Sequence, residues 1–332
     1  MRILVLGGTR FLGHTVAAEA VRRGHEVVCA ARGTAGEVPA GARLVKVDRD
    51  REDGLAALAG ERFDAVVDVA TISYEWVRRA LDAFGDQVGH WTFVSSISAY
   101  ANPGLPSTGV GDPLLPPKAV HGTREAMRED PDLYGSVKVA SEHAVTAAVG
   151  AKALIVRAGL ITGPGDEFDR FGYWPQRLVR GGRVLIPDVD HEIQYIDVRD
   201  LAAWVVDAAE QGTTGIFDGI GPATPLPALL TAIADTLGAN VEFVRVGEEE
   251  LLERGIAPWA GPRSLPLWLP ESHKYMGARD AGPALAAGLT PRSLADAIAG
   301  ALDHERNLGI DRERKAGLTL EDEAEVVAAL RA

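Results

Sequence analysis

Strand-like and helix-like segments alternate through the first half of the chain. Short apolar runs occur at Ile3–Leu6, His25–Ala30, Arg43–Val47, Ala65–Val69, Trp91–Val94 and Ala153–Val156. Segments with apolar residues at helical spacing lie between most of them, the longest at 133–149. Strands that alternate with helices form a parallel sheet covered on both faces, and right-handed crossovers make it doubly wound. The sequence therefore predicts a doubly wound α/β fold.

The pattern changes after Arg157. Residues 162–193 are rich in Gly, Pro, Asp and aromatic residues, whereas a strand and a helix return over 194–220. We expect residues 1–161 and 194–220 to form the sheet domain, and residues 162–193 and 221–332 to form a smaller C-terminal lobe. The acidic run at 248–250 should begin a solvated helix. Open parallel sheets place their sites at the carboxyl ends of the strands, so the site should lie between sheet and lobe.

Charge and composition exclude several classes of function. The chain has 34 Lys and Arg against 47 Asp and Glu, a formal charge of −13, and no basic run exceeds two residues. Such a chain repels phosphate backbones, which argues against nucleic acid as a partner. Cys29 is the only cysteine, which fits a reducing cytoplasm, and no histidine spacing suggests a metal site. The apolar run at the N-terminus is too short for a signal peptide or membrane helix, so we expect a cytoplasmic protein without a membrane partner.

A glycine-rich loop, GGTRFLG, stands between the first expected strand and the first expected helix. Glycine lets a backbone turn sharply and approach a pyrophosphate, and the following helix N-terminus offers amide donors and a favourable dipole. The alternative is a simple turn between a strand and a helix. The position of the loop, six residues from the start, favours a dinucleotide site in a Rossmann domain. The expected cofactor contacts are Gly7, Thr9, Arg10, Phe11, Leu12 and Gly13.

Tyr134 and Lys138 are four residues apart in a helical segment, so they share one face. A free tyrosine has a pKa near 10 and is a poor base at neutral pH. A neighbouring ammonium group stabilises the phenolate and brings the pKa closer to the working range. We therefore expect Tyr134 to act as the acid/base and Lys138 to assist it and to hold the nicotinamide ribose. The alternative is an exposed Tyr–Lys pair on a surface helix.

These motifs together resemble the short-chain dehydrogenase/reductase superfamily, in its extended and atypical epimerase/dehydratase-like (isoflavone-reductase-like) branch. The loop is similar to the family's GxxGxxG fingerprint, with Arg10 at the middle position, and the Tyr–Lys pair is similar to its YxxxK motif. Residues 157–164 and 196–202 resemble two later family elements. The resemblance covers nearly the whole chain and is weakest after residue 222.

The resemblance also implies roles for residues at the other strand ends. Ser96 corresponds to the serine that binds the reacting oxygen, with Ser98 as the alternative. Asp48 stands where the family contacts adenine, and Ala70 where the chain passes the adenosine ribose. Family relatives often dimerise through helices flanking the sheet, so a homodimer is also implied.

The leading functional hypothesis is an NAD(P)-dependent oxidoreductase that transfers hydride between the cofactor and a small-molecule carbonyl or alcohol. The first alternative is a nucleotide-sugar epimerase or dehydratase with tightly bound NAD. The second is a non-catalytic cofactor-sensing or RNA-binding relative. Sugar dehydratases of the family carry an Asp–Glu pair where this chain has Ile97 and Ser98, and nucleotide-sugar enzymes place an asparagine where this chain has Leu160. Both differences argue against a nucleotide-sugar substrate.

The segment after the sixth expected strand contains a cluster of aromatic and charged residues that either covers the substrate or forms the lobe core. Arg170 or Arg177 could pair with one anionic group of a substrate. Trp259 and Trp268 are expected to pack within the lobe. The substrate-binding residues expected from the sequence are Ser98, Arg170, Tyr173, Trp174 and Gln194.

The end of the second strand indicates which cofactor binds. Enzymes that prefer NAD usually carry a carboxylate there, and this chain has Ala31 followed by Arg32. Arg32 can reach a 2′-phosphate, and Arg10 could add a second positive charge. NADP is therefore the expected cofactor, with NAD as the alternative. The alternative is that both arginines are ordinary solvated surface residues that contact no phosphate.

Overall fold

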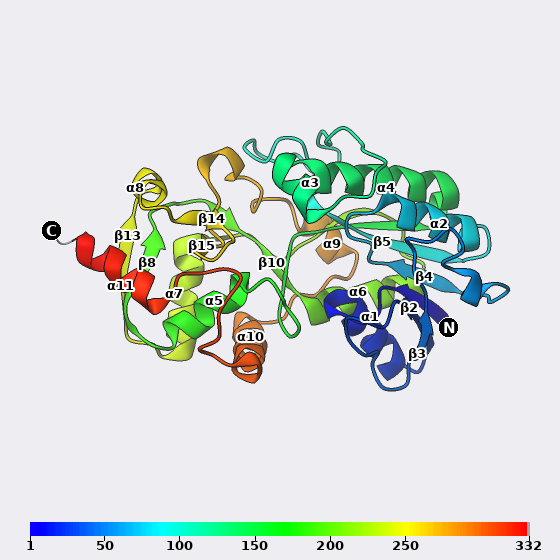
Figure 1. Cartoon of the computed structure of the whole chain (residues 1–332), viewed down its shortest axis with the longest axis horizontal. Helices are drawn as coiled ribbons and strands as arrows, with labels where there is room; N and C mark the ends of the chain where they lie inside the picture. The colour runs from blue at the N-terminus through cyan, green and yellow to red at the C-terminus, as the bar shows by residue number, and fades with distance from the viewer. Residues whose placement is uncertain (331–332) are drawn as a thin grey trace.

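A seven-stranded parallel sheet forms the centre of the first domain (Figure 1). The computed structural model describes residues 1–330. The strand order is β11-β6-β5-β4-β1-β2-β3, and every neighbouring pair is parallel. The strands are β1 (Arg2–Leu6), β2 (Glu26–Ala31), β3 (Arg43–Lys46), β4 (Ala65–Asp68), β5 (His90–Ser96), β6 (Ala153–Ala158) and β11 (Gly215–Gly219). The order reverses between β1 and β4, which confirms the predicted doubly wound sheet.

Helices cover both faces of this sheet, which explains why successive residues of its central strands are apolar. Ile3 and Val5 of β1 face one core, and Leu4 and Leu6 face the other. The first core includes residues of α1 (Phe11–Arg22) and α6 (Val198–Gln211). The second includes residues of α2 (Tyr74–Phe84) and α4 (Leu133–Val149). Short helical turns lie at η1 (Ala56–Leu58), η2 (Ile97–Ala99), α3 (Arg124–Glu129) and η3 (Gly150–Lys152).

The C-terminal lobe has a core of its own, centred on Phe171, Trp174 and Trp268. The predicted helix α7 (Leu226–Leu237) and strand β13 (Val241–Val246) are confirmed, as is the acidic helix start at α8 (Glu248–Glu253). The other lobe strands are β8 (Gly182–Pro187), β9 (Glu192–Ile193), β12 (Thr224–Pro225), β14 (Ala257–Trp259) and β15 (Ser264–Pro266). The paired strands β7 (Leu160–Thr162) and β10 (Tyr195–Asp197) contact both cores, because Leu160 packs in the lobe core and Ile196 in a core of the sheet domain. The other lobe helices are α5 (Arg170–Leu178), η4 (Glu271–His273), α10 (Leu294–Leu308) and α11 (Leu320–Ala329).

One segment that the sequence assigns to the lobe packs on the sheet domain instead. Ala284 of α9 (Gly282–Ala286) and Leu289 belong to the same buried core as Trp204 of α6. The indole nitrogen of Trp204 donates a hydrogen bond to the carbonyl of Ala287 (2.8 Å). The chain therefore returns to the sheet domain after the lobe strands and then leaves it again for α10.

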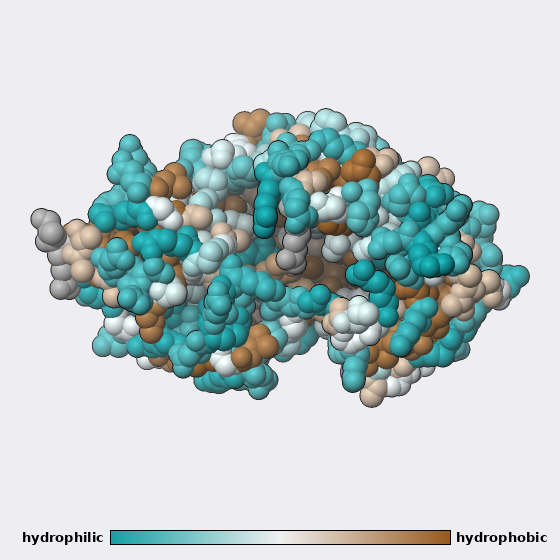
Figure 2. Space-filling model, viewed as in Figure 1, coloured by the Kyte–Doolittle hydropathy of each residue, from teal (hydrophilic) through white to brown (hydrophobic). Residues whose placement is uncertain are grey.

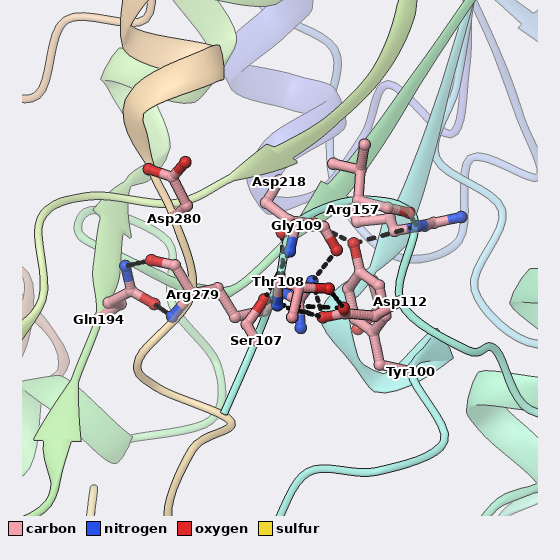
Figure 3. A network of polar contacts seen from close by, with 12 residues as sticks. Tyr100, Ser107, Thr108, Gly109, Asp112, Arg157, Gln194, Asp218, Arg279 and Asp280 are labelled. Atoms are coloured by element: carbon pink, nitrogen blue, oxygen red, sulfur yellow. Dashed lines mark hydrogen bonds and ion pairs between the residues drawn. The ribbon is translucent and has the colours of Figure 1, made fainter. Parts of the chain in front are cut away.

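A buried network of charged side chains joins the lobe segment to the sheet (Figure 3). Asp218, in β11, accepts hydrogen bonds from Arg279 Nε (2.7 Å) and from the Tyr100 hydroxyl (2.7 Å). Arg157 donates to the same hydroxyl (3.0 Å) and pairs with Glu142 of α4 (2.7 Å). Through Tyr100, the network fixes the segment that directly follows Ser96, the last residue of β5, and that includes Ser98.

A surface indentation separates the lobe from the sheet domain on one side of the molecule. In the space-filling view the lower outline is indented between the lobe and the sheet domain (Figure 2). No helix within residues 1–330 combines the length and the apolar character needed to cross a membrane.

Candidate active site

The glycine loop is packed too closely to accept side chains. Gly7 has a φ of +106°, a conformation that favours glycine. A Cβ on Gly13 would lie 2.3 Å from the carbonyl oxygen of Gly7, and one on Gly8 would lie 2.4 Å from Cys29 Sγ. These contacts explain why glycine stands at these positions, where the loop packs directly against its neighbours.

The start of α1 fits an anionic ligand. Arg10 is the N-cap residue and makes no capping hydrogen bond with its side chain, and the first turn holds no acidic residue. The first amides of a helix have no acceptor within the helix, so those of Phe11, Leu12 and Gly13 are available to a pyrophosphate. Loop and helix together fit the expected dinucleotide.

Lys138 is buried and held by two backbone carbonyls. Its Nζ donates to the oxygens of Ala70 (2.5 Å) and Val94 (2.7 Å), which stand at the ends of β4 and β5. The third N–H of the ammonium remains for another partner. Burial lowers the pKa of Lys138 to about 8, although the carboxylates of Asp68 and Glu142 oppose this shift. Lys138 therefore keeps its positive charge at neutral pH.

Tyr134 lies next to Lys138 on α4, with Lys138 Nζ 5.7 Å from the centroid of its ring. Burial raises the pKa of Tyr134, while a hydrogen bond with Ser96 and the charge of Arg170 act in the opposite direction. The net shift is upward, so the lowering of this pKa expected from the neighbouring ammonium is not found, because burial outweighs it. The phenol is thus neutral and able to give a proton. The fold brings together Ser96, Tyr134 and Lys138.

Ser96 is the last residue of β5 and caps the turn that follows. Its Oγ accepts from the amide of Ser98 (3.1 Å) and donates to Ser98 Oγ (3.2 Å). The Ser96 hydroxyl is therefore oriented by the η2 turn, and Ser98 supports that orientation.

Arg170, the first residue of α5, faces the same place from the lobe side. Its guanidinium carbon lies 4.9 Å from the ring centroid of Trp259 and 5.2 Å from that of Phe168. Asp166 is buried nearby, and burial raises its pKa to about 6. The sequence placed both Asp166 and Arg170 in the cluster after the sixth expected strand, and Trp259 packs against the lobe core as expected. The contact between Trp259 and Arg170 was not predicted.

The other substrate-binding residues expected from the sequence, Tyr173, Trp174 and Gln194, are buried by packing between elements. Tyr173 and Trp174 are almost fully buried, because α5 is covered by α7 and α10, and Trp174 Nε1 donates to the carbonyl of Pro266 (2.8 Å). The side-chain amide of Gln194 is hydrogen-bonded to the backbone of Gly221 and Arg279. Arg177 is paired with Glu323. Of the two arginines proposed to bind an anionic group of the substrate, Arg170 is therefore the one that has no carboxylate partner among the described residues.

The two arginines expected at the 2′-phosphate have carboxylates close to them. Arg10 Nε donates to Glu167 Oε1 (2.6 Å), which bridges the glycine loop and the lobe. Arg32 is exposed, and its Nη1 lies 4.0 Å from Asp50 Oδ2. Asp48 is half-buried and accepts from the amide of Asp50 (3.2 Å). Arg32 is thus only loosely paired, whereas Arg10 is firmly paired.

A buried ion pair that the sequence did not indicate shapes the end of β4. Asp68 is fully buried and accepts from Arg49 Nη1 (2.9 Å) and from the amide of Ala70 (2.9 Å). It thereby fixes the turn whose carbonyl, at Ala70, holds Lys138. A single aspartate inside the apolar run 65–70 was the signal that could have identified it.

The chain is similar to known proteins over most of its length. Residues 3–218 match the model of the NAD dependent epimerase/dehydratase family. A 3-diazoavenalumate denitrifying reductase from a Streptomyces species is 26% identical over 262 residues, which cover 72% of this chain and 82% of that protein.

Solved structures share the fold. The UDP-glucose 4-epimerase of Thermus thermophilus, solved with NAD, superposes with a TM-score of 0.64 at 20% identity, covering 92% of this chain and 99% of that one. The UDP-N-acetylglucosamine 4-epimerase of Bacillus cereus gives 0.65 at 18% identity, covering 94% and 98%. Together with the family match and the geometry above, these findings lead to one conclusion: the chain belongs to the NAD dependent epimerase/dehydratase family and is an NAD(P)-dependent enzyme of the short-chain dehydrogenase type.

Proposed function

We propose that this enzyme is a reductase that uses NADPH to reduce a carbonyl or similar electrophilic group of a small molecule that is not a nucleotide sugar. The observation that carries the proposal is the neutral phenol of Tyr134, which is hydrogen-bonded with Ser96 and has the ammonium of Lys138 5.7 Å from its ring centroid. A proton donor, a hydrogen-bond donor and a fixed positive charge are what carbonyl reduction requires of the protein.

The bound nicotinamide would supply the hydride. On substrate binding the Ser96 hydroxyl turns from Ser98 Oγ and donates its hydrogen bond to the substrate oxygen, which keeps that oxygen within reach of Tyr134. Tyr134 then gives its proton to that oxygen, and the ammonium of Lys138 stabilises the phenolate that remains. The carbonyls of Ala70 and Val94 keep the ammonium in place.

The lobe supports a substrate other than a nucleotide sugar. Leu160, where nucleotide-sugar enzymes of the family carry an asparagine, is buried in the lobe core and offers no side-chain hydrogen bond to a diphosphate. The likeness to the reductase from Streptomyces, although at 26% identity, supports a reduction.

The cofactor preference rests on the end of β2. Ala31 offers no carboxylate to a ribose 2′-hydroxyl, and Arg32 is exposed with one distant carboxylate at 4.0 Å. Such a guanidinium can exchange a weak partner for a 2′-phosphate, because charge-assisted bidentate contacts are the stronger ones. We therefore propose NADPH over NADH.

Replacing the proton donor tests the reaction. The assay follows NADPH oxidation with a panel of aromatic and aliphatic aldehydes and ketones. Tyr134→Phe keeps the ring, so it should bind cofactor normally yet lose at least about 100-fold in turnover. Tyr275→Phe, a phenol in the lobe whose side chain stacks with Lys274, is the matched control and should retain wild-type turnover. Near wild-type turnover in Tyr134→Phe contradicts the proposal.

A second measurement separates reduction from epimerisation. UDP- and TDP-sugars at sub-millimolar concentration should leave the melting temperature unchanged. A rise of several degrees, or NAD that stays bound through purification and is not consumed, would favour the epimerase instead.

A further inference from the structure

We infer that the substrate carries a carboxylate on an aromatic or conjugated framework, and that Arg170 is the residue that binds this carboxylate. The inference rests on the proposed function for the reacting group. Its evidence is that Arg170 has no carboxylate partner among the described residues and lies beside two aromatic rings.

Arg170 is a half-buried cation without a carboxylate partner. Its Nε is shielded from solvent and has no hydrogen-bond partner, and no hydrogen bond or ion pair joins its guanidinium to another of residues 1–330. A guanidinium has five N–H donors, and leaving the shielded Nε–H unsatisfied is costly. The site therefore holds unused binding capacity for an anion.

The fully buried arginines of the described chain show the usual arrangement. Arg49 pairs with Asp68, Arg157 with Glu142, Arg177 with Glu323 and Arg279 with Asp218. Each has a carboxylate supplied by the fold. Arg170 departs from this pattern at the point where the lobe meets the catalytic tyrosine.

The position of Arg170 places a bound group beside the reacting centre. Its charge acts directly on the phenol of Tyr134 and lowers the pKa of that group. An anion held by Arg170 would thus leave the rest of a small substrate within reach of Tyr134. Arg170 selects the substrate by its charge, whereas Tyr134 acts on the carbonyl.

Two aromatic rings on either side of Arg170 indicate what accompanies the anion. Phe168 is exposed. Trp259 has a backbone φ of +68°, which residues other than glycine rarely adopt. Both rings lie within 5.2 Å of the guanidinium carbon. Flat apolar surfaces beside a guanidinium suit a planar acid, because the guanidinium takes the carboxylate through two parallel N–H bonds while the rings contact the framework.

Asp166 is the competing partner for Arg170, and the structure keeps the two apart. Its Oδ1 accepts from the amide of Phe168 (2.9 Å), and its Oδ2 has no hydrogen-bond partner among the described residues. No ion pair within 4.0 Å joins it to Arg170 in that part of the chain. The aspartate is thus held by its own turn and leaves the guanidinium to an external acid.

Binding of a matched pair of probes tests the inference without relying on turnover. The wild-type enzyme, saturated with NADP⁺, is titrated calorimetrically with benzoate and with benzamide. We expect benzoate to bind at least about tenfold more tightly than benzamide, and Arg170→Met to lose about ten- to a hundredfold of benzoate affinity with benzamide unchanged. Arg170→Lys should recover part of the loss, since it restores the charge without the paired N–H geometry.

Two controls make each result decisive. Arg180→Met, two residues beyond the end of the same helix, removes an arginine that pairs with Asp311 and should not change benzoate affinity. The Arg170→Met protein should have a melting temperature at or above that of the wild type, because the guanidinium is unpaired. A melting temperature below that of the wild type would show that Arg170 stabilises the ionised Asp166.

Several outcomes would overturn the inference. These are benzoate that does not bind, benzoate that binds equally to Arg170→Met, and phenyl phosphate that binds more tightly than benzoate. Because these measurements need no turnover, Arg170-dependent benzoate binding in an enzyme whose Tyr134→Phe variant remains active would refute the proposed reaction and leave the carboxylate site standing.

Discussion

The guanidinium carbon of Arg279 lies 3.3 Å from the centroid of the Tyr100 ring. Both side chains also bind the same carboxylate, Asp218, which is almost fully buried at the end of β11 (Figure 3). Arg279 belongs to the chain that returns from the lobe, whereas Tyr100 follows Ser96, the serine proposed to bind the reacting oxygen. Their contact therefore links the position of the lobe to that of Ser96.

Arg279→Met should be strongly destabilising. It leaves Asp218 buried with only the Tyr100 hydroxyl as a side-chain partner, and breaking a buried pair typically costs about 3–5 kcal/mol. Urea unfolding measures the loss. Arg254→Met is the control, because it removes an ion pair of Arg254 and Glu250 at one helix end and should cost no more than about 0.5 kcal/mol. A loss below about 1 kcal/mol for Arg279→Met would show that the network does not hold the domains.

Lys138→Met should weaken both turnover and cofactor affinity. The variant loses the charge beside Tyr134 and the N–H that is free to meet the ribose, and it leaves the carbonyls of Ala70 and Val94 without their donor. Fluorescence titration with NADPH and steady-state kinetics measure the two effects. Lys118→Met, which removes a partly exposed lysine paired with Asp130, should change neither. Unaltered cofactor affinity in Lys138→Met would mean that this lysine does not contact the ribose.

Asp166→Asn should stabilise the protein at neutral pH, by up to about 3 kcal/mol for a shift from 3.8 to about 6. The folded state binds the Asp166 proton more tightly than the unfolded state does, so burying the ionised carboxylate costs stability above pH 6. Below pH 4 both states are protonated and the cost vanishes. The advantage of the variant should therefore be full above pH 6 and disappear as the pH falls to 4.

Unfolding curves of wild type and Asp166→Asn between pH 4 and 8 measure this effect. The charges facing Asp166 are those of Arg170 and His304, which favour its ionised form, and Asp169, which opposes it. A variant less stable than wild type at pH 7 would indicate that Asp166 and Arg170 stabilise each other.

Arg32→Ala should weaken NADPH binding by about ten- to a hundredfold and leave NADH binding nearly unchanged. Arg10→Ala should act in the same direction but less, because Arg10 is already paired with Glu167. Arg43→Ala, on the neighbouring strand and paired with Glu61, serves as the control. Dissociation constants for both cofactors measure the effect, and equal losses for NADPH and NADH would refute the preference for NADP.

Local sequence patterns were enough to predict the helix that holds Tyr134 and Lys138 and several elements of the lobe. The helices at 133–149 and 226–237 and the strand at 241–246 occur with the predicted bounds, because their periodicity or strand propensity is complete within each segment. The spacing of Tyr134 and Lys138 already placed them on one face of α4. Glycine at positions 7, 8 and 13 likewise indicated a loop in which backbone replaces side chains.

Only the tertiary structure decided which charged residues are paired and which are not. Arg177 and Glu323 are 146 residues apart, and Arg279 and Asp218 are 61 apart, so no local pattern relates them. The same holds for the aromatic cluster after β6, where α7 and α10 bury Tyr173 and Trp174 but leave Arg170 next to Tyr134. The sequence by itself determined the doubly wound sheet, the glycine loop and the Tyr–Lys pair, since each depends on spacing within one element. The unpaired state of Arg170, the role of Asp68 behind Lys138 and the return of α9 to the sheet depend on packing between distant segments, and they exist only in the folded chain.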